Sequence, residues 1–293
     1  EERIDVVHLH FSKDTWWVIP ALCFSPLPVV ILTKHVESRV NKKDIPHRLI
    51  NGRLNKVIAV SEMIRRNFLK TTALKTSKVI TIYCGLDLEM YHPKIYKERN
   101  VSLEFGFDSA TKVVGIVGRL CPGKGQEDFL KAAKLILKVS PKTVFMVVGD
   151  DIGAPGYRNY LKDLAQRLEI SEKIIFTGHR DNIPEMLSLF DVFAFTSLSE
   201  SFGLTLIEAM AMEKPVVAFD AGAVREIMED GSSGILIPLG DIPSLAEAVV
   251  SLLNDSARCK RFGARSRKIV EEKFSLDAAI AKTEKVYAEC LTR

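Results

Sequence analysis

The chain has 293 residues, of which 47% are hydrophobic and 27% are charged, and its formal net charge is +4. This composition excludes disordered, collagen-like and low-complexity chains, and at roughly 100–200 residues per domain the length predicts two domains. The longest apolar runs are far shorter than the ~20 residues that a membrane-spanning helix needs, so no transmembrane segment is expected.

The five cysteines are scattered along the chain and form no Cys-x-x-Cys pair. Such a set argues against a disulfide framework or a zinc site and favours a reducing cytoplasm. The chain starts at Glu1, with neither Met nor a signal peptide, so we expect a mature product or a fragment.

Four short apolar runs in the first 90 residues predict strands, at 4–8, 29–32, 57–60 and 79–82. Ser61 is a suitable N-cap for a helix over 62–70. The segment 93–110 interrupts this pattern, because it contains Pro93, many charges and no strand pattern. We expect an interdomain linker there.

From residue 111 onward, short β-branched runs alternate with amphipathic stretches. The runs predict buried strands at 113–117, 144–148, 174–176, 192–195, 216–218 and 234–237. The stretches between them predict helices at 127–139, 157–168, 183–189, 204–212 and 224–229, and three more are expected at 244–253, 257–274 and 276–291. This alternation is typical of a doubly wound parallel sheet.

These patterns predict a first domain over 1–92, a linker over 93–110 and a second domain over 111–275. The last helix, within 276–293, either caps the second domain or packs back on the first.

The charge is uneven, since the first 99 residues contain 17 Lys and Arg against 10 Asp and Glu. A basic surface there fits anionic lipid, a phosphorylated acceptor or nucleic acid, or is an ordinary solvated surface.

The loop after the strand at 113–117 reads Gly-Arg-Leu-Cys-Pro-Gly-Lys-Gly and precedes a helix. Its glycines allow close backbone approach, the helix N-terminus favours an anion, and Arg119 and Lys124 add two positive charges. The loop favours a phosphate or diphosphate, although its spacing is neither that of the Walker loop nor that of the dinucleotide fingerprint. The alternative is a basic turn that caps the helix.

The loop after the strand at 192–195 leads into a helix and carries two carboxylates, Glu200 and Glu208, eight positions apart. Backbone N–H groups of Phe202, Gly203 and Leu204 stand at the start of that helix. Carboxylates accept hydrogen bonds from sugar or ribose hydroxyls, while a helix N-terminus favours phosphate. Alternatively, Glu200 caps the helix and Glu208 forms a salt bridge.

Several motifs occur together in a fixed order. The motifs of the second domain are Gly118-Arg119-Leu120, Lys124-Gly125, the Glu200 and Glu208 pair, Lys214-Pro215-Val216 and Gly222-Ala223-Val224-Arg225-Glu226. Those of the first domain are His8-Leu9-His10, Thr33-Lys34-His35, Val60-Ser61-Glu62 and Gly85-Leu86-Asp87. This order resembles glycosyltransferase family 4, whose members are retaining enzymes with the GT-B fold. The resemblance covers nearly the whole chain. It implies an α/β protein with two Rossmann-like domains, whose parallel sheets face each other across a cleft and of which the N-terminal one is incomplete.

The resemblance implies transfer of a sugar from a nucleotide diphosphate sugar, UDP-sugar first and GDP-sugar next, to a glycan or lipid-linked acceptor in cell-envelope polysaccharide synthesis. The implied donor-binding residues are Gly118, Arg119, Lys124, Gly178, His179, Arg180, Glu200, Ser201, Phe202, Gly203, Leu204 and Glu208. The implied catalytic residues are His35, Arg119, Lys124 and Glu200.

Within this set the resemblance implies distinct roles. Arg119 and Lys124 would bind the diphosphate, Glu208 the ribose and Glu200 the donor sugar, with 178–180 beside the base. His35 and, more weakly, His10 are acceptor-side candidates. His8 is expected to be a histidine whose ring is satisfied in the core.

The reaction is expected to need neither a metal nor another cofactor. Metal-dependent sugar transferases hold their cation on an Asp-x-Asp motif, and this chain has none. Arg119 and Lys124 would then stabilise the charge that develops on the leaving diphosphate. Retention is implied by the family, and front-face attack assisted by the leaving phosphate is the preferred mechanism.

Relative to the family, the first part of the N-terminal domain is missing. A sheet without those strands would have an open edge, through which the chain could self-associate.

The basic first domain could also dock on anionic membrane at the inner face of the cell membrane. The residues that could contribute are Trp16, Trp17, Phe24, Lys42 and Lys43. Alternatively, the tryptophans are core residues, as tryptophans beside residues such as Val18 and Ile19 more often are.

Three other readings remain open. The chain could be a truncated or non-catalytic nucleotide-sugar-binding protein, or a nucleotide-sugar epimerase on the same fold. A nicotinamide-dependent oxidoreductase is disfavoured, because the glycine fingerprint with its downstream acid is missing. No motif supports binding to nucleic acid.

Overall fold

The computed structural model describes residues 4–22, 28–96, 104–108 and 110–292. The chain divides into two compact units. Unit 1 contains Glu1–Gly85 together with Phe274–Arg293, and unit 2 contains Leu86–Lys273. The end of the chain therefore belongs to the same unit as its beginning.

Unit 1 is built on a four-stranded parallel sheet in the order β1-β2-β3-β4. Its strands are β1 (Val6–Leu9), β2 (Val29–Lys34), β3 (Lys56–Ala59) and β4 (Val79–Thr81). Because side chains alternate along a strand, Val30 and Leu32 point to one face of the sheet and Ile31 to the other. Each face therefore needs its own cover.

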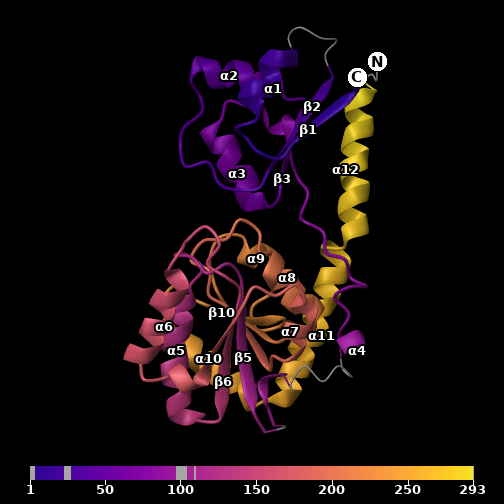
Figure 1. Cartoon of the computed structure of the whole chain (residues 1–293). Helices are drawn as coiled ribbons and strands as arrows, with labels where there is room; N and C mark the ends of the chain where they lie inside the picture. Colours follow the sequence, from indigo (N-terminus) through magenta and orange to yellow (C-terminus); the bar gives the residue numbers. More distant parts are fainter. Residues whose placement is uncertain (1–3, 23–27, 97–103, 109, 293) are drawn as a thin grey trace. The chain divides into compact units, whose positions relative to one another are not determined.

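Helices from both ends of the chain provide that cover. Residues of α1 (Thr15–Leu22), α2 (Ile45–Gly52) and α3 (Glu62–Thr71) pack on the face that holds Val30, and the short 3-10 helix η1 (Thr76–Lys78) leads into β4. On the opposite face, Val286 and Cys290 of α12 (Leu276–Leu291) pack against Ile31. Figure 1 shows α12, in yellow, alongside this sheet.

The predicted strands of unit 1 are confirmed to within two residues at each end, and Ser61 caps α3 by accepting a hydrogen bond from the N–H of Ile64 at 3.2 Å. Two helices were missed. The sequence of α1 is apolar almost throughout and contains Pro20, so it has no helical periodicity. The start of α2 could have been found, because Asp44 is an N-cap and a proline follows in the first turn.

Unit 2 contains a six-stranded parallel sheet in the order β10-β9-β8-β5-β6-β7. Its strands are β5 (Lys112–Val117), β6 (Thr143–Val148), β7 (Ile174–Gly178), β8 (Val192–Phe195), β9 (Val216–Phe219) and β10 (Gly234–Ile237). The order reverses between β5 and β8, which are neighbours although they are distant in sequence. Ligands of doubly wound sheets bind at this reversal, beyond the carboxyl ends of the strands.

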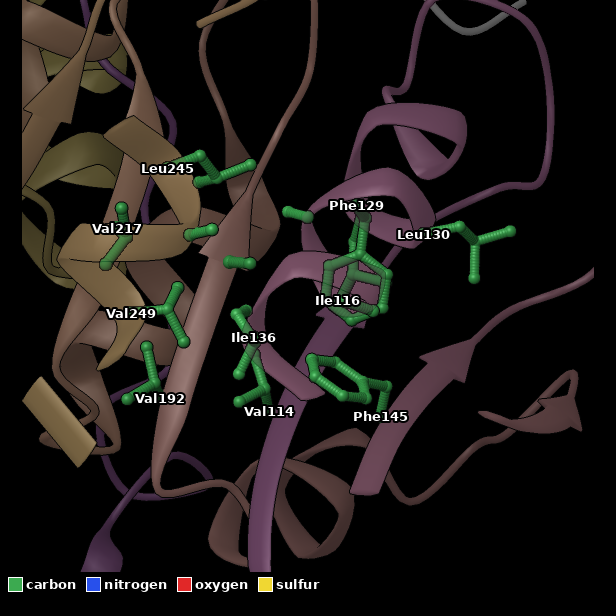
Figure 2. Packing of buried hydrophobic residues seen from close by; sticks show 14 of the residues in the cluster. Val114, Ile116, Phe129, Leu130, Ile136, Phe145, Val192, Val217, Leu245 and Val249 are labelled. Carbon is green, nitrogen blue, oxygen red and sulfur yellow. The ribbon is translucent and has the colours of Figure 1, made fainter. Parts of the chain in front are cut away.

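The helices of unit 2 are α4 (Pro93–Tyr96), α5 (Gln126–Val139), α6 (Tyr157–Arg167), α7 (Ile183–Ser188), α8 (Leu204–Ala211), α9 (Val224–Ile227), α10 (Ile242–Leu253) and α11 (Ser256–Lys273), with a 3-10 turn, η3 (Ser171–Lys173). Apolar residues of α5, α6 and α10 fill a core against the sheet. Figure 2 shows Phe129, Leu245 and Val249 packed beside the strand residues Val114 and Val217.

The segment predicted as a linker over 93–110 begins with α4, which is grouped with unit 2. Residues 97–103 and 109 lie outside the described residues. Just before α4, the Arg267 guanidinium of α11 donates hydrogen bonds to the backbone carbonyls of Leu88 and Tyr91, and also to that of Ala211. The segment that leads into α4 is therefore held against α11 and the end of α8.

His8 joins three elements of unit 1. Its Nδ1 lies 2.6 Å from the hydroxyl of Tyr287 on α12, and its Nε2 lies 2.7 Å from Oγ1 of Thr33 on β2. Burial, together with the neighbouring His10 and His35, lowers the pKa of His8 from 6.5 to about 4. His8 is therefore a satisfied, neutral histidine, as the sequence predicted.

We expect unit 1 to lose stability as the pH falls from 6.5 to about 4, because unfolded His8 then binds a proton that folded His8 does not. With allowance for solvent screening, the loss at about pH 5 is about 1 kcal/mol. Urea unfolding followed by tryptophan fluorescence measures it, since both tryptophans, Trp16 and Trp17, lie in unit 1.

The His8→Gln variant is the matched comparison, because glutamine keeps polar atoms at this position and does not titrate. It should be less stable near neutral pH but should lose stability less steeply on acidification. Equal slopes in the two proteins would contradict the role given to His8.

Candidate active site

The loop between β5 and α5 is fixed by backbone hydrogen bonds to the end of the neighbouring strand β6 and to the loop that follows it. The N–H of Gly118 donates to the carbonyl of Val148 at 3.0 Å, and the N–H of Leu120 donates to that of Asp150 at 2.8 Å. The carbonyl of Arg119 accepts a 2.8 Å hydrogen bond from the side-chain amide of Gln126, which is buried. The Arg119 side chain itself is exposed and makes no hydrogen bond or ion pair with any residue that the structure describes.

The loop between β8 and α8 lies directly against the first one. The hydroxyl of Thr196 donates to the carbonyl of Gly125 at 2.8 Å, and the N–H of Leu198 donates to that of Gly123 at 2.9 Å. Gly125 has φ +75°, and a Cβ there would lie 1.8 Å from the carbonyl oxygen of Thr196. Only glycine fits at this position.

The two loops bring together Lys124 and Glu200, two of the residues predicted for the site. The Lys124 ammonium lies 2.8 Å from a Glu200 carboxylate oxygen, and the two side chains are 29% and 13% exposed. The carbonyl of Glu200 accepts from the N–H of Ala223 at 3.0 Å, and a Cβ on Gly222 would lie 2.1 Å from that carbonyl. Glu200 is thus fixed by its backbone and by its carboxylate.

Glu200 does not cap α8, because Gly203 occupies the N-cap position with φ +112° and no side-chain hydrogen bond caps the helix there. The first turn of α8 therefore begins without a capping side chain. Phe202 is buried in front of it, Ser201 is partly buried and Leu204 is half-exposed. This start of α8 can present backbone N–H groups to an anion.

Glu208 lies on α8 and is hydrogen-bonded to the hydroxyl of Tyr91. Burial raises the pKa of the Glu208 carboxyl, and the hydrogen bond from Tyr91 opposes that shift. Burial and the Glu208 charge raise the pKa of Tyr91, so its hydroxyl stays protonated and donates. The salt bridge considered as an alternative is not formed by Glu208 in the described part of the chain.

Tyr91 was missed by sequence reasoning, which placed it at the edge of the linker. It is 8% exposed, and its carbonyl accepts a hydrogen bond from Arg267. An aromatic residue two positions before Pro93 gives no signal of a contact with a carboxylate on α8. Only the folded chain brings the two together.

Gly178 ends β7, at one edge of the unit 2 sheet, and His179 and Arg180 follow it. Gly178 accepts a 3.0 Å hydrogen bond from the N–H of Gly149. His179 is exposed, with Nε2 3.1 Å from Asp181, and Arg180 pairs with Glu104 at 2.5 Å. Over the described residues, neither side chain pairs with the charged groups on the first two loops.

His10 and His35 lie together in unit 1, at the carboxyl ends of β1 and β2. Nδ1 of His10 and Nε2 of His35 are 3.1 Å apart and the two rings are stacked, and the ring of His8 also stacks with that of His10. Partial burial, His10 and Lys34 lower the pKa of His35. Both acceptor-side candidates therefore belong to one group of side chains.

Over the described residues, no three His, Cys, Asp or Glu side chains are arranged to hold a metal ion. No helix in the described ranges has the length and apolarity to cross a membrane. Among the described residues, Cys84, Cys121, Cys259 and Cys290 are not in a disulfide, and Cys23 lies outside those residues.

Comparison with known proteins identifies the two halves of the chain. The family described as "Glycosyl transferases group 1" matches residues 99–269, and "Glycosyltransferase Family 4" matches residues 1–90. The N-acetyl-alpha-D-glucosaminyl L-malate synthase of Bacillus anthracis is 26% identical, over 99% of this chain and 76% of its own length. An Escherichia coli UDP-Gal:alpha-D-GlcNAc-diphosphoundecaprenol alpha-1,3-galactosyltransferase is 27% identical, over 87% of this chain and 68% of its own length.

The fold is also shared with solved structures. Anabaena HepE, crystallised with UDP and glucose, superposes with a TM-score of 0.82 at 24% identity, over 96% of this chain and 77% of HepE. The chain spans 66% and 47% of two further curated relatives. The predicted pairing of two Rossmann-like parallel sheets is confirmed as the GT-B fold. With a family match over more than half of its length, the chain belongs to the glycosyl transferases group 1, with a glycosyltransferase family 4 segment at its N-terminal end.

Proposed function

We propose that this chain transfers a hexose from a UDP-sugar to a glycan or lipid-linked acceptor, with retention of anomeric configuration and without a metal ion. The observation that carries this proposal is the gathering of Arg119, Lys124 and Glu200 on two interlocked loops at the strand-order reversal of unit 2, with Glu208 on the helix that follows. Support for UDP comes from HepE, which was crystallised with UDP and glucose. A GDP-sugar is the second choice of donor.

The charges match a nucleotide diphosphate sugar group by group. Arg119 and Lys124 supply two cations for the two phosphates, and the uncapped start of α8 supplies backbone donors. Glu208, with Tyr91 donating to it, accepts from the ribose hydroxyls. Glu200 accepts from hydroxyls of the sugar, and the backbone at 178–180 lies beside the base.

For the transfer step, the protein has to stabilise the negative charge on the leaving diphosphate more than it has to supply a nucleophile. The bond from the anomeric carbon to the phosphate oxygen breaks, and its electron pair remains on the diphosphate. Arg119 and Lys124 stabilise that charge. The acceptor hydroxyl forms the new bond on the same face and gives its proton to the leaving phosphate oxygen. His35 and His10 orient the acceptor from unit 1.

Replacing Glu208 by glutamine should weaken UDP-sugar binding by about tenfold to a hundredfold, because a charged hydrogen-bond acceptor for the ribose is lost. A thermal-shift titration with UDP-, GDP- and ADP-sugars measures this, since binding raises Tm by mass action. The UDP-sugars should give the largest shifts in the unsubstituted chain.

Glu247, exposed on α10, provides the matched control. The Glu247→Gln variant removes the same charge away from the site and should keep the original affinity. Unchanged affinity in Glu208→Gln would contradict the ribose assignment, and donor binding without transfer or hydrolysis would favour a nucleotide-sugar-binding protein.

Activity should persist in excess EDTA, because Arg119 and Lys124 take the place of a metal ion. In Arg119→Met, kcat for transfer or donor hydrolysis should fall by about 100-fold or more, as for other lost oxyanion donors. Lys162→Met, which removes a charge from an exposed position on α6, should leave kcat unchanged. Complete loss in EDTA that magnesium or manganese reverses would overturn the metal-free site.

We also propose that unit 1 contacts the inner face of the cell membrane, and the support for this is a group of exposed apolar residues. Trp17, Ile45 and Leu49 are 79%, 74% and 69% exposed on α1 and α2, and Trp16 contacts His47 edge to face. We call Trp16, Trp17, Ile45 and Leu49 the tryptophan patch. Lys43 and Arg48, both exposed on or beside α2, give it the charge that anionic lipid attracts. The third predicted aromatic residue, Phe24, lies outside the described residues.

The chain should sediment with vesicles that contain phosphatidylglycerol, and less so as salt is raised. A double variant, Trp17→Ala with Leu49→Ala, should bind at least about tenfold more weakly because apolar area is lost. Leu239→Ala, at an exposed position in unit 2, is the control. Equal binding to neutral vesicles at all salt concentrations would contradict this surface.

A further inference from the structure

Four basic side chains of unit 1 form a group that the donor chemistry does not use. Lys34 is the last residue of β2 and His35 follows it, while His10 follows β1 and Lys42 lies in the loop between β2 and α2. A ring nitrogen of His10 lies 3.1 Å from one of His35. His35 follows Lys34 directly in sequence, and the positive charge of Lys42 lowers the pKa of Lys34. We call these four residues the basic cluster.

Lys34 is buried and Lys42 is partly buried, and neither has a counter-charge among the described residues. Lys34 is 5% exposed, and its ammonium donates to the hydroxyl of Ser12 at 3.2 Å. Within the described ranges, no carboxylate lies at ion-pair distance from Lys34 or Lys42. Burial and the Lys42 charge lower the pKa of Lys34 to about 8, and burial also lowers that of Lys42. Such burial destabilises the fold unless an anion offsets it.

The frame around the cluster holds it in place. The loop after β2 is tied to α3, because the N–H of Ser38 donates to the Asn67 side chain at 2.8 Å and the N–H of Lys42 donates to the carbonyl of Thr71 at 2.7 Å. His8 is held by its bonds to α12 and β2 and stacks on His10. The cationic groups are therefore positioned before any ligand arrives.

We propose that the basic cluster binds a phosphate group carried by the acceptor. The inference rests on the proposed function, since it gives the acceptor's chemical class. Two ammonium groups and two imidazoles suit a dianion with several acceptor oxygens better than they suit a single carboxylate. Lys34 is too deeply buried to reach a flat anionic surface, so its partner must be one group that enters the site.

Imidazole signals in a proton–carbon NMR spectrum test this directly, because they report on His10 and His35 separately from the diphosphate site of unit 2. Inorganic phosphate should shift both signals in a saturable way, while sodium chloride at equal ionic strength should not. Lys42→Gln should weaken this binding by about tenfold or more, the effect of losing one charge-assisted hydrogen bond.

The control is Lys75→Gln. Lys75 is exposed at the start of η1, which leads into the amino end of β4. The basic cluster lies instead at or beyond the carboxyl ends of strands of the same sheet. Lys75→Gln should change phosphate affinity by less than about twofold, the size expected for a screened surface charge. His8 and His47 signals at the same positions as in the unsubstituted chain would show that Lys42→Gln is folded. Lys34→Met is a second variant that should also weaken phosphate binding. Equal loss in Lys42→Gln and Lys75→Gln, or no response to phosphate, would overturn the proposal.

Two sources of phosphate can be separated by further arms of the titration. Glucose 1-phosphate represents a soluble sugar phosphate, and phosphatidylcholine vesicles with or without phosphatidic acid represent a lipid phosphate. A Lys42-dependent shift with either source supports the proposal and identifies the acceptor class. UDP binding by unit 2 is measured on the same samples. If the chain binds UDP but the basic cluster binds no phosphate, this inference is wrong while the proposed function still stands.

Discussion

The candidate site depends on one close approach, that of the Gly125 and Thr196 backbones. Each belongs to a loop that leaves a central strand of unit 2, and hydrogen bonds from Thr196 and Leu198 join the loops. Because a Cβ on Gly125 would collide with the Thr196 carbonyl, only glycine allows these hydrogen bonds to hold the two loops so close together. Lys124 and Glu200 are thereby held within 2.8 Å of each other by the fold, before a ligand contributes anything.

Most of the fold could be predicted because buried parallel strands have a strong sequence signal. Runs such as Val192–Phe195 and Gly234–Ile237 are continuous and apolar, and the observed strands begin and end at the same residues. The signal fails where a helix is not amphipathic, as in α1, whose Trp17 is exposed instead of forming the core. It also fails for Tyr91, whose partner on α8 is set by tertiary packing.

The two units treat buried charge in opposite ways. In unit 2, Lys124 pairs with Glu200, and Glu208 accepts from Tyr91, so both glutamates of the site have a partner in the ligand-free fold. In unit 1, Lys34 has only the hydroxyl of Ser12. Sequence alone could place Arg119, Lys124 and the two glutamates in order, but a lysine at a strand end looks the same whether or not a carboxylate faces it.

The placement of α12 has a consequence for synthesis of the chain. The sheet of unit 1 is translated before unit 2, yet Ile31 and Ile58 on one of its faces are covered by Val286 and Cys290, which are translated after unit 2. At about 5–20 residues per second, the ribosome needs on the order of 10 s or more to make the intervening unit 2. Unit 2 is continuous in sequence and can finish folding first. Until α12 emerges, the nascent chain exposes an apolar sheet face, which is a natural binding site for a chaperone.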